Sequence, residues 1–327
     1  MPPKKGKLIV ADLKRRSEKG LLLAKQTLQA EKMEPLELRN AFKHYIKYWD
    51  DFTHVGFFSL ACEAVGGTPD DNLLPQAAIA MMAAAFDIHD DIIDRSEEKN
   101  KIPTVYGKYG IEMALLLGNA FLIYGLKLFA DTITIFPTEK GKSVLETTRQ
   151  LLFEVGNGHA SEVNLKRKRL TPNDYMIITQ MKAASIEADM MLGALFGGGN
   201  ETEIASFARL GRILGILATL RDDLVDVFDI EELHQRIVAK DLPVQLLFAM
   251  RDKKAKTKIK AILSNPKITE DAVTELVELT LNTSSTAEMK NEMQLLIGEG
   301  LSLINKLPRK KLRSKIQALI SFMLEDL

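Results

Sequence analysis

Residues 75–94 read PQAAIAMMAAAFDIHDDIID, an apolar stretch that ends in a run of aspartates. Good helix formers dominate it, and Pro75 is typical of a first helical turn. The residues that share one side of such a helix are Asp87, Asp90, Asp91 and Asp94. Like charges at this spacing repel one another, and burying them uncompensated would cost several kcal/mol each. The pattern therefore predicts a helix whose acidic end meets a cation.

A second acidic run repeats the first about 130 residues later. Residues 210–226 read LGRILGILATLRDDLVD, again an apolar helical stretch that ends in aspartates: Asp222, Asp223 and Asp226. Carboxylates without a nearby His or Cys cluster suit a hard cation such as Mg²⁺, which proteins usually share with substrate phosphates. Two such faces across a cavity would hold a diphosphate between them. A solvated helix face is the alternative for either run, but its repetition favours the metal site.

The composition excludes several classes of protein. The 327 residues are 46% hydrophobic, and 44 basic residues balance 44 acidic ones, so we expect no nucleic-acid partner. The single cysteine, Cys62, suits a reducing compartment, and the N-terminus lacks the apolar stretch of a signal peptide. No segment reaches the roughly 18–20 uncharged apolar residues of a membrane span. We therefore expect a cytoplasmic protein without a transmembrane segment.

The organisation of the chain indicates an all-α protein. Helices are expected at 36–64, 75–94, 111–130, from Thr171-Pro172 onward, and at 201–229, 243–264, 269–280 and 285–325. Residues 95–108 form a loop, and no strand pattern or repeat is visible. We expect a basic N-terminal extension at residues 1–33, solvated and helical, followed by one domain at 34–327.

Further motifs make the chain resemble a known family. They are His89-Asp90-Asp91-Ile92-Ile93-Asp94, Ile102-Pro103-Thr104, Leu117-Gly118-Asn119, Lys182-Ala183-Ala184 and Arg221-Asp222-Asp223-Leu224-Val225-Asp226. In order and spacing they are similar to those of the trans-prenyltransferase (polyprenyl diphosphate synthase) family, over about residues 35–325. The resemblance implies the isoprenoid synthase fold, a single-domain helical bundle around a deep apolar cavity. It also implies three Mg²⁺ ions and a homodimer.

The resemblance assigns roles to individual residues. Asp90, Asp94 and Asp222 would bind metal directly, and Asp91, Asp223 and Asp226 would complete the metal site. Lys182 and Lys240 would contact an allylic prenyl diphosphate, and Lys99, Arg221 and Phe86 are further expected substrate-binding residues. The implied chemistry is ionisation, in which Mg²⁺ and Lys182 stabilise the departing pyrophosphate and leave an allylic carbocation. His159 stands near the cavity in this alignment, but a solvent-contacting helix histidine is equally compatible, and it is left out of the expected site.

The chain departs from the family at a second site, which holds isopentenyl diphosphate for chain elongation. In place of the family's lysine, two arginines, upstream histidine and later paired arginines stand Asp51, Phe52, His54, Ala83, Lys99 and Asn100. A diphosphate needs fixed cations, and Asp51 places a negative charge where the family's lysine would bind this substrate. The metal-binding motifs are complete, whereas the second site has lost its ligands.

This asymmetry leaves three functions open. We expect first an enzyme that ionises an allylic prenyl diphosphate with Mg²⁺ and gives the cation a terpene-synthase-like fate. The first alternative is a chain-elongating prenyltransferase, a geranylgeranyl or polyprenyl diphosphate synthase with an altered second site. The second alternative is a regulatory subunit that forms a heteromer with an active prenyltransferase.

Overall fold

The all-α architecture expected from the sequence is confirmed in a computed structural model. The structure describes residues 4–166, 170–238, 242–265, 267–305 and 310–324, and Lys240 lies outside them. The described helices are α1 (Lys4–Gln29), α2 (Leu36–Tyr48), α3 (Thr53–Val65), α4 (Leu73–Asp94), α5 (Val105–Thr132), α6 (Thr138–Lys166), α7 (Pro172–Lys182), α8 (Ala184–Phe196), α9 (Glu201–Asp226), α10 (Ile230–Val238), α11 (Val244–Ala249), α12 (Lys253–Leu263), α13 (Glu270–Leu281), α14 (Ser285–Asn305) and α15 (Lys310–Phe322). The short elements are the 3₁₀ turns η1 (Pro69–Asn72) and η2 (Ile133–Ile135) and the strands β1 (Glu98–Lys99) and β2 (Ile102–Pro103).

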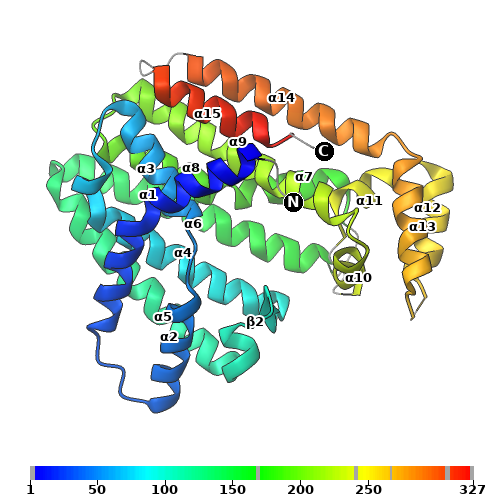
Figure 1. The fold of residues 1–327 in the computed structure, drawn as a ribbon, viewed down its shortest axis with the longest axis horizontal. Coiled ribbons are helices and arrows are strands. Elements are labelled where there is room, and N and C mark those ends of the chain that lie inside the picture. Colours follow the sequence, from blue (N-terminus) through cyan, green and yellow to red (C-terminus); the bar gives the residue numbers. More distant parts are fainter. Residues whose placement is uncertain (1–3, 167–169, 239–241, 266, 306–309, 325–327) are drawn as a thin grey trace.

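The central helices are those that carry the motifs. α4 packs along α5, and α8 packs against both α3 and α9 (Figure 1). Close packing explains Gly118 in α5, because a Cβ there would lie 2.5 Å from the His89 Nε2 of α4. The His89 ring therefore points toward α5, while the aspartates on either side of it remain at the end of α4.

Several expected helices are interrupted. The stretch 36–64 is two helices, α2 and α3, and the Asp51 carboxylate accepts the Thr53 N–H at the start of α3. In the stretch 243–264, Asp252 is the N-cap of α12 and accepts the N–H groups of Lys254 and Ala255. Such local side-chain hydrogen bonds compete with helix continuation without disturbing the apolar periodicity. The stretch 285–325 likewise contains two helices, α14 and α15.

The N-terminal stretch is packed, not solvated, over the residues of α1. This helix lies against α3 and α4, and its Ala24 and Leu28 are buried in the core. Arg16, also buried, binds Asp12 of α1 at 2.8 Å and Glu63 of α3. Residues 4–29 therefore contribute to the helical core, although their composition is basic.

The loop between α4 and α5 contains a small antiparallel hairpin, β1–β2, which the sequence did not indicate. Asn100 and Lys101 have φ values of 52° and 64° and form its turn. The hairpin turns Lys99 back over α4, where its ammonium reaches Asp87 and Asp91.

The apolar helix α5, with η2, is long and apolar enough by composition to cross a membrane. It contains Glu112 and Lys127, so its uncharged stretch is still shorter than the uncharged span that the sequence was searched for. A core helix passes the same test, and α5 packs along α4 and α2. Its other side exposes large apolar residues: Ile111, Leu115, Leu116, Ile123 and Leu126.

Candidate active site

The first aspartate run occupies the last two turns of α4. Asp91 is 5% exposed, and its Oδ1 lies 2.7 Å from Lys99 Nζ. Burial outweighs this pairing and raises the pKa of Asp91 to about 6. Asp90 Oδ1 lies 3.1 Å from His159 Nδ1 on α6. Burial would raise the pKa of Asp90, but the hydrogen bond from His159 prevails and holds it below its usual value.

The second run ends α9, and an arginine from α10 binds part of it. Arg236 Nη1 lies 2.7 Å from Asp223 Oδ1 and 2.9 Å from Asp226 Oδ2. The other oxygen of Asp223, a 3% exposed residue, accepts the backbone N–H of Val244 at 3.1 Å. Asp223 and Asp226 are thus oriented by the protein itself.

Asp222 differs from its two neighbours, because no hydrogen bond or ion pair binds its carboxylate among the described residues. The pKa of Asp222 is raised to about 6, mainly because the surrounding protein desolvates it and, to a smaller extent, because Asp226 and Asp223 repel its charge. A carboxylate held near two others is stabilised by a bound cation.

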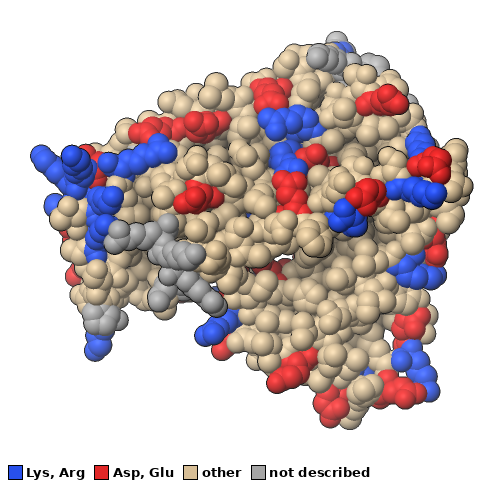
Figure 2. All heavy atoms as spheres, turned by 180° about the vertical axis from the view of Figure 1, so that it is seen from behind, with Lys and Arg blue, Asp and Glu red and all other residues tan. Residues whose placement is uncertain are grey.

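Helix α7 links the two runs. Its Tyr175 hydroxyl bonds to Asp223, and its last residue, Lys182, is close enough to Asp90 and Asp94 for their charges to act on it. Lys182 Nζ binds Glu162 of α6 at 2.9 Å. Burial disfavours this ammonium, but the three carboxylates outweigh it and raise the pKa of Lys182. Lys182 is therefore a fixed cation beside the first aspartate run. Figure 2 shows acidic atoms inside a hollow near the middle of one face of the molecule.

Two of the expected substrate-binding residues, Arg221 and Lys99, are bound by other groups of the chain. Arg221 has other partners, because its Nη1 donates to the carbonyl oxygens of Phe322 and Met323 at 2.9 and 3.2 Å. Its guanidinium also lies 4.4 Å from the centre of the Phe322 ring, so it anchors α15. Lys99 is held by Asp87 and Asp91 at 2.6 and 2.7 Å.

A narrow pocket lies below the first aspartate run, between α3, α4, α6 and α8. Its volume is about 30 Å³, and its walls include Met82, Phe86, Leu152, Thr148, His54 and Asp189. Phe86 precedes Asp90 by one helical turn, so this wall of the pocket lies one turn away from the aspartate run. The expected cavity residue Phe86 therefore does line a pocket.

The polar residues of this pocket were not expected. His54 Nδ1 lies 2.6 Å from Asp189 Oδ2, and Asp189 is 5% exposed. Burial would lower the pKa of His54, but the Asp189 carboxylate prevails and raises it to about 9. Burial raises the pKa of Asp189. Because the pKa values of both groups are raised, the pair keeps its one proton at neutral pH, and we assign it as an ion pair.

Sequence reasoning missed the partners of the aspartates. His159 was set aside, although it contacts Asp90, and Arg236 gave no signal because it lies on a separate helix. Asp189 could have been found, since it is a lone charge within the apolar stretch ADMMLGALF. Charges in such positions are almost always paired.

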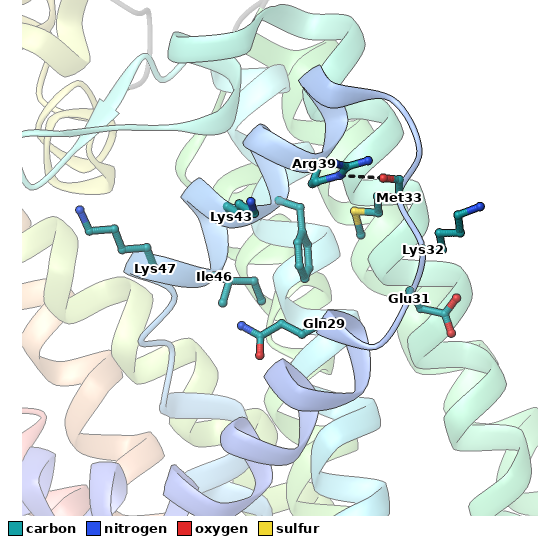
Figure 3. A pocket seen from close by; sticks show the side chains of 9 residues that line it. Gln29, Glu31, Lys32, Met33, Arg39, Lys43, Ile46 and Lys47 are labelled. Carbon is teal, nitrogen blue, oxygen red and sulfur yellow. Dashed lines mark hydrogen bonds between the residues drawn. The ribbon is translucent and has the colours of Figure 1, made fainter.

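A wider pocket of about 550 Å³ lies between the end of α1 and the start of α2 (Figure 3). Several basic side chains surround it, and those of Lys32 and Lys47 point outward. Lys32 binds Glu34 at 2.6 Å, and Arg39 donates to the Met33 and Glu34 carbonyls at 3.0 Å each. None of the aspartates lines this pocket. We therefore place the candidate active site at the aspartate runs.

The donors at the aspartate runs fit a hard cation, since all of them are carboxylate oxygens. Within the described ranges, no three His, Cys, Asp or Glu side chains converge on one point. Mg²⁺ is commonly held by one or two carboxylates together with waters and substrate phosphates, and needs no cage made of protein alone. The arrangement suits a cation that binds together with a phosphorylated ligand.

This fold, with an aspartate run at the end of each of two central helices, defines a class of all-α proteins. A family model described as polyprenyl synthetase matches residues 37–280, and the chain belongs to this family, whose members are transferases of isoprenoid biosynthesis.

Relatives and solved structures agree with this assignment. A short chain isoprenyl diphosphate synthase of Methanothermobacter thermautotrophicus is 31% identical over 210 residues, 64% of each chain. A heterodimeric geranylgeranyl pyrophosphate synthase large subunit of Arabidopsis thaliana is 26% identical over 64% of this chain and 59% of its own. The chain thus spans 64% and 59% of the lengths of these two relatives, less than two thirds in each case. The fold matches a geranylgeranyl pyrophosphate synthetase of Pyrococcus horikoshii with a TM-score of 0.85 at 24% identity, over 99% of this chain and 100% of that one.

Proposed function

We propose that this protein is a Mg²⁺-dependent prenyltransferase that ionises an allylic prenyl diphosphate and lengthens it to a longer isoprenyl diphosphate. The observation that carries the proposal is that helix α7 contacts both aspartate runs, with Tyr175 bonded to Asp223 and the cation Lys182 beside Asp90 and Asp94. The names of the relatives, which are isoprenyl and geranylgeranyl diphosphate synthases, support elongation over the terpene-synthase-like fate that the sequence analysis placed first.

The metal ligands are proposed from the two aspartate motifs and the family pattern. Asp90, Asp94 and Asp222 would bind Mg²⁺ directly, and Asp91, Asp223 and Asp226 would bind or orient its waters. Bound Mg²⁺, in our proposal three ions, would neutralise the charge that develops on the departing pyrophosphate.

Residues of the chain itself would prepare this step. Lys182, buried beside the first run, would donate to the diphosphate and stabilise pyrophosphate as it leaves. Arg236 holds Asp223 and Asp226 before any ligand binds, so less reorganisation is needed in the reaction. Lys240 is proposed as a second diphosphate contact from the family pattern.

A second candidate is supported by the residues at the place of the family's other substrate. We call residues 49–54 with Asp87, Lys99 and Asp189 the acceptor side. Its cations Lys99 and His54 are both bound to carboxylates of the chain. A weakly bound acceptor would favour loss of a proton or capture of water by the cation, as in a terpene synthase.

The assembly is proposed to be a homodimer. The exposed apolar side of α5 offers a surface for a second copy, and the same surface would serve a prenyltransferase partner in a heteromer. The heteromeric alternative is supported by the large-subunit relative, which is named as part of a heterodimer.

The decisive test is a product assay with purified protein, Mg²⁺ and C10, C15 or C20 allylic diphosphates, with and without isopentenyl diphosphate. We expect longer isoprenyl diphosphates only when both substrates are present. Hydrocarbons or alcohols from the allylic substrate alone would favour the second candidate. No pyrophosphate release from any allylic diphosphate would refute both.

A further inference from the structure

The surface helix α12 concentrates positive charge that the composition of the whole chain hides. Basic and acidic residues number 44 each, but α12 contains no acidic residue and five lysines: Lys253, Lys254, Lys256, Lys258 and Lys260. Figure 2 shows basic atoms gathered at the end of the molecule where α12 lies in Figure 1. The positive potential is therefore local to this helix.

The lysines lie on the outer side of α12. Its buried residues, Ala255 and Ile259, are one turn apart and pack into a core shared with α10, α11 and α13. All five lysines are exposed, and helical periodicity places them on the side opposite this buried strip. Every residue of α12 is described, and none of its large apolar residues is exposed. The outer side can therefore bind a partner through charge and not through apolar insertion.

The five ammonium groups lack partners among the described residues, where no hydrogen bond or ion pair reaches them. The Asp252 carboxylate accepts the backbone N–H groups of Lys254 and Ala255, and Glu288 binds Arg251 at 3.1 Å. The neighbouring helix α13 carries four exposed acidic residues, but over the described ranges no ion pair joins them to α12. The charge of α12 thus remains available to an external anion.

The stability of the helix does not explain these lysines. Lys254 and Lys258 are four residues apart, a spacing at which like charges repel. Lys253 and Lys254 occupy the first turn, where the helix dipole disfavours cations. The neighbouring α13 follows the usual rule, with acidic residues in its first turn. An anion bound outside α12 would relieve both effects.

A pocket of about 470 Å³ between α12 and the start of α14 adjoins the lysines. Lys254, Lys258 and Arg251 are its basic wall residues, and Asp252 and Glu288 also line it. Because Glu288 binds Arg251, Lys254 and Lys258 remain for a phosphate. The pocket has room for the phosphate of a lipid headgroup.

We propose that the outer side of α12 is a docking surface for a lipid bilayer that carries anionic headgroups. Clustered lysines bind such a surface through their charge, without a matching shape. Nucleic-acid recognition commonly adds arginine forks or aromatic rings, and α12 has neither. The apolar chain of an isoprenyl diphosphate also favours a bilayer over water, and to this extent the choice of partner rests on the proposed function.

The test is co-sedimentation of the purified protein with vesicles of equal parts phosphatidylcholine and phosphatidylglycerol, and with vesicles of phosphatidylcholine alone. We expect binding to the anionic vesicles only, and release at about 1 M salt, where the screening length falls to about 3 Å. Replacing Lys253, Lys256 and Lys260 together by Gln should weaken binding on the order of 10²-fold, about fivefold per lysine.

The matched control changes the net charge equally but away from α12. Lys32→Gln, Lys127→Gln and Lys142→Gln, combined in one chain, remove three exposed lysines that already bind carboxylates. This variant should bind the vesicles as the wild type does, and both variants should keep the native circular dichroism.

Three results would overturn the proposal: no preference for anionic vesicles, equal loss of binding in the two triple variants, or capture of a short DNA duplex without vesicle binding. The measurement needs no turnover. The docking surface and the proposed enzymatic function can therefore fail independently of each other.

Discussion

The two halves of the candidate active site contain the same types of charged residue but pair them differently. We call Asp90, Asp94, Asp222, Asp223, Asp226 and Lys182 the allylic side. On that side Asp222 has no partner among the described residues, and Lys182, paired with Glu162, lies beside Asp90 and Asp94. On the acceptor side, His54 and Lys99 are neutralised by carboxylates of the same chain. The two sides therefore differ in Asp222, a carboxylate without a partner among the described residues, whereas both cations of the acceptor side are paired within the chain.

The largest expected effect is on the allylic side. Asp90→Ala and Asp222→Ala should each lower the rate of pyrophosphate release on the order of 10³-fold, because each would remove a Mg²⁺ ligand. The rate is measured with a coupled pyrophosphate assay at saturating Mg²⁺. Asp131→Ala, which removes an exposed surface carboxylate, serves as the control. A loss below tenfold in both variants would contradict the assignment of these aspartates.

Removal of the fixed cation should have the next largest effect. Lys182→Ala is expected to lower kcat by about 10²-fold, since its interaction strengthens as charge develops on the leaving pyrophosphate. Lys182→Arg should recover part of this loss, whereas Lys127→Ala at the surface should change nothing. A change in KM alone would show that Lys182 only binds the ground state.

Arg236 tests whether orientation of the second aspartate run matters. Arg236→Ala should weaken the apparent Mg²⁺ affinity about 10–100-fold, because Asp223 and Asp226 lose the group that holds them. Mg²⁺ titrations of activity measure this effect, with Arg209→Ala, which breaks a surface pair with Glu299, as the control. An unchanged Mg²⁺ dependence would mean that Arg236 has a structural role only.

The smallest effect concerns the stability of the acceptor side. The pKa of His54 is raised to about 9, so the ion pair stabilises the fold fully below pH 6.5 and loses this contribution as pH rises through 9. Wild type should exceed His54→Gln in unfolding free energy on the order of 2 kcal/mol near pH 6.5. The difference should shrink toward pH 9.5, as measured by urea unfolding. A difference that grows with pH would show that His54 is neutral in the folded protein.

The aspartates could be located from sequence because helical periodicity fixes which residues share a face. Asp90, Asp91 and Asp94 needed only the assignment of one helix, and that helix ends at Asp94 as expected. The separation of α2 from α3 could not be read in this way, because the apolar periodicity does not show the local hydrogen bond that Thr53 N–H donates to the Asp51 carboxylate.

The pairing of charges could not be predicted from sequence spacing at all. Arg236 reaches Asp223 from a separate helix, and Asp189 meets His54 only because α8 packs on α3. Sequence showed that the acceptor side had lost cations. It did not show that the remaining ones are already bound.

The central claim is that the cleft is built for one tightly bound diphosphate per chain. Calorimetric titration with Mg²⁺ and a non-ionising allylic thiolodiphosphate, followed by isopentenyl diphosphate, tests it directly. We expect one tight Mg²⁺-dependent site per chain and a second that is at least tenfold weaker. Two sites of equal affinity would contradict it.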